Sequence, residues 1–215
     1  MAVRGRVVLE GILFAAAVAS DPSGVVILWK AATGGKAVGC IPATSVPELL
    51  LAADLLPMTV ESTEDLSLVS GQVDALVVGA DPFPFPIPAG GIPRFAFPRV
   101  AMGSVEEALD RIEALAEWTC AVSGSPASEG ALWKSIRAHA TRRSLLEALN
   151  DRCAREAGFL TPEERRVIVR AGNFLPAGAH SRLLSSILGT DPEPAAIPAE
   201  GERGDPLIVL AKRLI

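Results

Sequence analysis

Two kinds of segment alternate along the first part of the chain. Residues 36–41, 58–60 and 74–79 are short apolar runs, which predict buried strands. Residues 48–54 and 64–70 lie between these runs, and their composition predicts two short helices. Because strands and helices alternate, the pattern predicts a parallel sheet whose consecutive strands are joined by crossover helices.

The apolar N-terminal stretch has two interpretations. Residues 6–20 and 25–32 predict either helices or buried strands, because their periodicity fits both. Two arginines precede a run that ends in Ala17-Val18-Ala19, as in a secretory signal peptide. Glu10 interrupts this run, which favours an ordinary buried or amphipathic element of a cytoplasmic protein. The run is shorter than the about 20 apolar residues that cross a bilayer, so no membrane partner is expected.

A proline-rich segment follows the third predicted strand. Six prolines fall between Asp81 and Pro98, and proline removes a backbone donor and fixes φ. The segment is therefore predicted to be a rigid extended loop, in which residues 94–97 could form a fourth strand.

From about residue 104, the sequence pattern predicts helices. Apolar residues then recur at helical spacing, and residues 129–157 predict one long helix. Thr161, Pro162 and Glu164 are typical of a further helix start, and residues 181–188 predict a last helix. The expected organisation is an α/β domain over residues 1–190, a proline-containing linker over 191–206 and a terminal strand over 207–215. That strand could begin a second domain or return to the first sheet.

Composition excludes several classes of function. The chain has 215 residues and a net charge of −5 without a basic block, so nucleic acid is not an expected partner. The three cysteines Cys40, Cys120 and Cys153 are widely spaced and form no C-x-x-C pair. This spacing argues against a disulfide framework or a structural zinc site and favours small buried side chains.

A motif near the first strand resembles a known family. Residues 35–60 read GKAVGCIPATSVPELLLAADLLPMTV. This stretch resembles the opening of 2-hydroxyacyl-CoA dehydratase and benzoyl-CoA reductase subunits, with Asp54 where the family helix has glycine. Residues 74–79 and, in the helical region, residues 132–152, 169–176 and 180–188 are also similar to that family. The resemblance implies a Rossmann-like parallel sheet with flanking helices and a helical C-terminal region.

The family's cofactor positions do not carry over. The resemblance implies a [4Fe–4S] cluster held by cysteine thiolates. Counting back from Glu48, the first ligand position falls on Pro42, and the second falls near Pro82. Proline cannot ligate iron, and Cys40 lies two residues before the expected position. No cofactor and no metal ligand are therefore expected.

Candidate ligand-binding residues lie where the first and third strands end. Ligands of open α/β sheets bind beyond the carboxyl ends of the strands. Thr44 and Ser45 follow the first strand, and their alternative role is to cap the next helix. Asp81 follows the third strand, and its alternative role is to cap its own loop. His139 and His180 lie on separate predicted helices, which favours ordinary helical histidines over a metal pair. The sequence has no P-loop, G-x-G-x-x-G or G-x-S-x-G motif, so no catalytic residue is assigned. The candidates are Thr44, Ser45, Glu48 and Asp81.

Three functions remain open. The first is a cluster-free accessory subunit of a CoA-thioester dehydratase or reductase complex. The second is a stand-alone module that binds an acyl-CoA or another small ligand. The third, ranked last, is an enzyme such as a dehydratase-like lyase with chemistry at Cys40 or Asp81. The proline-rich loop suggests an interface at Phe83 and Phe85 for a homodimer or a larger dehydratase-like subunit, unless these rings fold onto the chain's own core.

Overall fold

The computed structural model describes residues 2–41, 46–79, 91–97 and 105–191. The chain divides into two compact units, and the division falls inside one long helix. Among the described residues, the sheet unit covers those between 26 and 135, and the helical unit covers 2–25 and 136–191.

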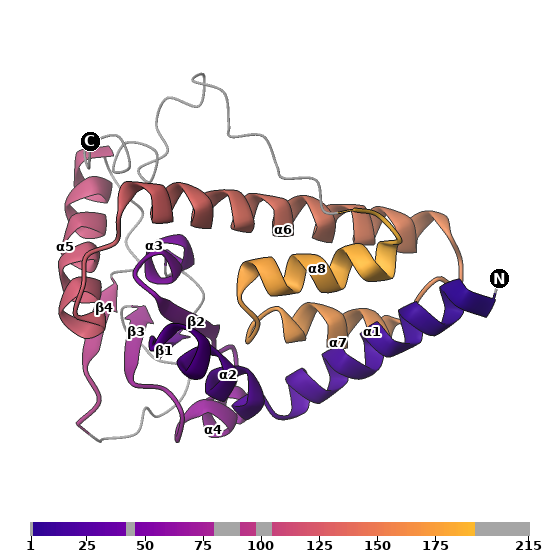
Figure 1. The fold of residues 1–215 in the computed structure, drawn as a ribbon, viewed down its shortest axis with the longest axis horizontal. Coiled ribbons are helices and arrows are strands. Elements are labelled where there is room, and N and C mark those ends of the chain that lie inside the picture. The colour runs from indigo at the N-terminus through magenta and orange to yellow at the C-terminus, as the bar shows by residue number, and fades with distance from the viewer. Residues whose placement is uncertain (1, 42–45, 80–90, 98–104, 192–215) are drawn as a thin grey trace. The chain divides into compact units, whose positions relative to one another are not determined.

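The sheet unit is built on four parallel strands (Figure 1). The strand order is β2-β1-β3-β4. Lys36 pairs with Leu55, Val38 with Ala75, and Leu76 with Arg94. This arrangement confirms the predicted parallel sheet and gives the unit a Rossmann-like α/β architecture. The strands are β1 (Lys36–Ile41), β2 (Leu55–Thr59), β3 (Ala75–Gly79) and β4 (Arg94–Phe97).

The crossover helices account for the burial of the strands. α3 (Pro47–Ala52) connects β1 to β2, and α4 (Thr63–Val69) connects β2 to β3. These two connections run in opposite directions along the sheet, so right-handed crossovers place the two helices on opposite faces, as Figure 1 shows. All of β3 is buried, which explains its continuous apolar sequence.

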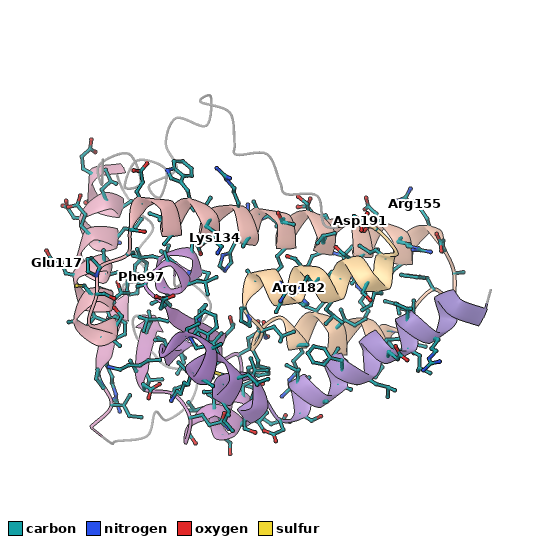
Figure 2. All side chains as sticks on the ribbon, in the orientation of Figure 1. Phe97, Glu117, Lys134, Arg155, Arg182 and Asp191 are labelled. Atoms are coloured by element: carbon teal, nitrogen blue, oxygen red, sulfur yellow. The ribbon has the colours of Figure 1, made fainter. Side chains whose placement is uncertain are left out.

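α2 (Ser23–Thr33) and α5 (Val105–Ser123) complete the sheet unit. α5 contacts β4 and α3, and its amphipathic sequence decides which side faces them. Glu117 lies on the exposed side of α5 and points away from the sheet in Figure 2. The side chains that face the core are Ala108, Leu109, Ile112 and Leu115.

The turn between α3 and β2 depends on a left-handed residue. Asp54 has φ 56°, the only positive φ among the described residues that are not glycine. This conformation ends α3 and starts β2 at Leu55, three residues earlier than the sequence predicts. The Asp54 carbonyl oxygen lies against Gly35, where a Cβ would come within 2.0 Å of it. Only glycine fits at position 35 without moving this turn.

In the part of the chain that the structure describes, the helical unit contains α1 (Ala2–Ser20), α7 (Pro162–Ala171), α8 (Ala177–Leu188) and most of α6 (Glu129–Arg155). The N-terminal stretch, for which the sequence left two interpretations, is helical and contacts both α7 and α8. Most of α8 is buried. The predicted helix start at Thr161 is confirmed: Thr161 and Glu164 form a capping box at the start of α7, and hydrogen bonds from Thr161 lower the pKa of Glu164.

Side chains from neighbouring helices satisfy the carbonyl groups at the ends of α7 and α8. Arg142 on α6 donates to Gly172 O at 3.3 Å, and Arg152 donates to Leu188 O at 2.9 Å. His180 Nε2 lies 3.0 Å from Ile168 O, and since a carbonyl only accepts, this nitrogen carries the hydrogen. Basic side chains are favourable at helix C-termini, so these bonds hold α6, α7 and α8 together.

Most of the exposed large apolar side chains of the described residues lie on α1 and α2. Leu13 on α1 is 60% exposed, and Leu28 on α2 is 70% exposed. No single described helix is long and apolar enough to cross a membrane. Gly5–Ser20 and Ser23–Thr33 reach that length and composition only when taken together as a bent pair.

Val77→Asp tests whether β3 is central. Val77 is 1% exposed and pairs with β1 on one side and β4 on the other. An unpaired carboxylate there should cost more than about 3 kcal/mol and lower the melting temperature by at least about 6 °C. Val169→Asp on the exposed side of α7 is the matched control, with an expected change of about 0.5 kcal/mol. Similar melting temperatures for the two variants would contradict the central position of β3.

Asp54→Gly tests the left-handed turn. Glycine adopts positive φ without the steric cost that other residues incur, so this variant should be more stable by about 0.5 kcal/mol or more. Asp54→Ala should instead lose about 1 kcal/mol, because alanine tolerates the left-handed region less well than aspartate. Urea unfolding of the three proteins measures both effects. Equal stabilities would show that position 54 is not held in this conformation.

Candidate functional site

The carboxyl edge of the sheet is the candidate site. The chain passes from β1 to β2 on one side and then returns across β1 to β3 on the other. Ile41 pairs with Val78 at the ends of these strands, and Val60 N–H donates to Cys40 O. The ends of β1, β2 and β3 therefore meet at one edge, as the sequence predicts. Ligands of such sheets bind at the point where the strand order reverses, here between β1 and β3.

Glu48 is the one predicted ligand-binding residue that the structure describes. It is half-buried in the first turn of α3, which follows β1 at the carboxyl edge. The N-cap of α3 is Val46, and no side chain makes a capping hydrogen bond. Thr44 and Ser45 lie outside the described residues, so their alternative role as caps of this helix stays a prediction. The other candidates Thr44, Ser45, Asp81, Phe83 and Phe85 lie outside the described residues.

A polar group missed by sequence reasoning lies at the end of β2. Ser62 Oγ accepts from Asp65 N–H at 3.0 Å, and the Asp65 carboxylate accepts from Glu61 N–H at 3.1 Å. Asp65 is buried, and these bonds fix the entry into α4. The spacing Ser62-x-x-Asp65 is a cap signal that could have revealed this pair. It adds carboxylates to the edge that carries Glu48.

The cysteines do not fit a [4Fe–4S] cluster. Cys40 lies inside β1 and is 1% exposed, and its thiol is 3.7 Å from Val38 O. Cys120 lies on α5 in the sheet unit, whereas Cys153 lies on α6 in the helical unit. Among the described residues, no three His, Cys, Asp or Glu side chains are grouped so as to hold a metal ion.

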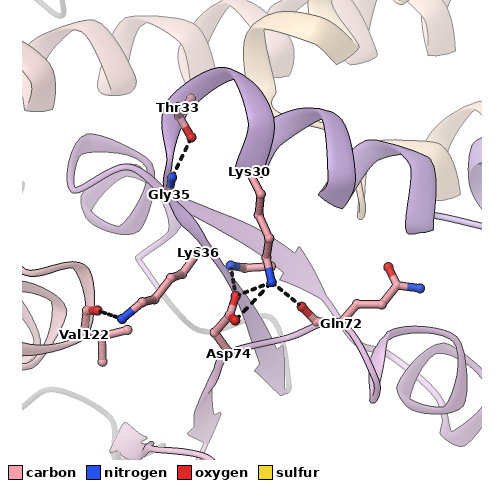
Figure 3. Close-up of polar contacts among 8 residues, drawn as sticks. Lys30, Thr33, Gly35, Lys36, Gln72, Asp74 and Val122 are labelled. Carbon is pink, nitrogen blue, oxygen red and sulfur yellow. Dashed lines mark hydrogen bonds and ion pairs between the residues drawn. The ribbon is translucent and has the colours of Figure 1, made fainter.

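A second polar cluster lies at the amino edge of the sheet (Figure 3). Lys30 Nζ on α2 is 2.8 Å from an Asp74 carboxylate oxygen and donates to Gln72 O at 3.2 Å. The same carboxylate accepts from Ala37 N–H at 2.8 Å. The pair joins α2 to the starts of β1 and β3. Because both side chains are partly exposed, this ion pair contributes only modestly to the stability of the sheet unit.

Lys36 makes a related contact at this edge. Its ammonium group donates to Val122 O at 2.6 Å, which ties the start of β1 to the end of α5 (Figure 3). This contact satisfies a carbonyl in the last turn of a helix, where a cation is favourable. The amino edge is therefore structural, and the carboxyl edge remains the candidate site.

A scan against protein-family models and a search of the curated proteins found no match to this chain.

Thiol reactivity tests the position of Cys40. A buried thiol reacts slowly with a water-soluble reagent, whereas Cys120 and Cys153 are both partly exposed. Native protein should therefore label first at positions 120 and 153, and position 40 should label only on unfolding. Peptide mass spectrometry after timed labelling measures the order. Cys40→Ser is the control, because it should leave the two faster reactions unchanged; early labelling at position 40 would contradict its burial.

Proposed function

We propose that this chain is a 2-hydroxyacyl-CoA dehydratase-like protein without an iron–sulfur cluster. In this proposal it is an accessory, non-catalytic subunit of a CoA-thioester dehydratase or reductase complex in the cytoplasm. Its partner is a larger dehydratase-like subunit or a second copy of the chain.

The geometry of the resembling motif carries the proposal. Asp54 stands where the family motif has glycine, and it has φ 56°. A backbone with positive φ is the physical reason for glycine at such a position. Gly35 opens the same motif and lies against the Asp54 carbonyl. Position 35 requires glycine, and position 54 requires a residue that tolerates positive φ. Both requirements match the residue types of the family motif, which supports the resemblance.

The residues at the inherited ligand positions support an accessory role. Proline stands at positions 42 and 82, and the nearest thiol, Cys40, is buried inside β1. A chain that cannot assemble cluster thiolates at these positions can still contribute its fold to a complex. In that role it would complete the substrate cleft or support a cluster-bearing partner.

A stand-alone acyl-CoA or small-ligand module is the second candidate. The reversal of strand order between β1 and β3 supports it, because this is where ligands of parallel sheets bind. Glu48 at the carboxyl edge is the one predicted ligand contact that the structure describes. A lyase with substituted chemistry at Cys40 has less support, since the described thiol is buried and bonded to a carbonyl oxygen.

Affinity purification from native extract tests the accessory role. The tagged full chain should co-purify with a dehydratase-like subunit identified by mass spectrometry, and the isolated chain prepared without oxygen should contain no iron. Phe83→Ser with Phe85→Ser should remove the partner if the proline-rich loop is the interface. Ile27→Ser with Leu28→Ser is the matched control, since both side chains are exposed on α2, outside that loop.

The outcomes separate the candidates. About four irons per isolated chain would contradict the cluster-free assignment. Absence of any dehydratase-like partner, together with calorimetric binding of coenzyme A that Glu48→Gln weakens, would favour the stand-alone module. Absence of both would refute both proposals.

A further inference from the structure

His180 is a buried titratable group that the proposed function does not use. It lies on α8 and is 1% exposed. Its ring packs against Gly172, where an added Cβ would lie 2.3 Å from Cε1. Nε2–H donates to Ile168 O, so Nδ1 is the unprotonated nitrogen. Nδ1 is buried and has no hydrogen-bond partner among the described residues.

The surroundings of the ring do not favour a second proton. Arg142 on α6 acts on the ring through its positive charge and donates to Gly172 O beside it. From α7, the ring meets a carbonyl and the Gly172 backbone. The charged side chains on the neighbouring helices α7 and α1 include the ion pairs Glu163–Arg166 and Arg6–Glu10. Glu164 accepts from Thr161, and Arg165 donates to Asn150.

We propose that His180 is an acid-sensitive switch that opens the helical unit while the sheet unit stays folded. A protonated ring would place a second buried cation beside Arg142 and a donor at Nδ1 with no acceptor. These two unfavourable interactions end only when α8 leaves its packed position, because Gly172 and Ile168 O hold the ring in place. The consequence would be release of α7 and α8 in acid.

The direction of the pH dependence follows from the pKa. The pKa of His180 is lowered from 6.5 to about 4: burial is the main cause, the bond to Ile168 O opposes it, and the Arg142 charge adds to the lowering. The unfolded unit therefore binds more protons than the folded unit between these values. Stability is complete above the unfolded pKa and falls as the pH drops from 6.5 toward 4. The opening equilibrium should rise by about fivefold to sevenfold per pH unit in this range.

Hydrogen exchange tests the switch on the untagged full chain. From about pH 6.5 to about pH 4.5, the opening equilibrium for α7 and α8 amides should rise about 40-fold after correction for intrinsic exchange. Amides of β1 and β3 should not follow this change. His180→Gln keeps a donor toward Ile168 O but cannot titrate, so it should lose the pH-dependent opening. His139→Gln, which removes the only other histidine of the chain, is the matched control and should retain it.

Two results would overturn the proposal. One is an unchanged pH dependence in His180→Gln, and the other is equal opening of the sheet unit over the same range. If His180→Gln does not fold, NMR titration of the His180 Cε1–H in the His139→Gln protein decides instead. A folded-state pKa near the ordinary 6.5 would then refute the switch.

Discussion

The contact between Gly35 and the Asp54 carbonyl sets the register on which the rest of the sheet unit depends. Gly35 immediately precedes β1 and Asp54 immediately precedes β2, so this contact aligns Lys36 with Leu55. A slip of one residue would turn every side chain of β1 to the opposite face. The same alignment brings the ends of β1 and β2 to a common edge, where β3 joins them. The position of the candidate site is thus a consequence of backbone packing at the opposite edge.

The parallel sheet was predictable because its strands are buried on both faces. Such strands read as continuous apolar runs, and residues 74–79 have this character without interruption. The first two helices were not predictable from periodicity, since the apolar runs within them fit a buried strand as well as a helix. The start of β2 was misplaced because a left-handed aspartate gives no distinct sequence signal.

Contacts between distant positions account for most of what the sequence did not reveal. Lys30 and Asp74 are 44 residues apart, and nothing in their local sequences links them. His180 reads as an ordinary helical histidine, and only the packing against Gly172 and Ile168 O distinguishes it. Of the candidate site, sequence reasoning located the carboxyl edge and Glu48 correctly within it, because both follow from strand direction. It missed the Ser62–Asp65 pair, although the spacing of those residues carried a signal.

The Gly35–Asp54 contact also has an evolutionary consequence. The two positions share one constraint but tolerate change very differently. Position 54 needs only a residue that accepts positive φ, so glycine, asparagine and aspartate can replace one another there at small cost. Position 35 admits no side chain at all, because the Asp54 carbonyl oxygen occupies the space of a Cβ. In homologous sequences, position 35 should therefore remain glycine while position 54 drifts among these three residues.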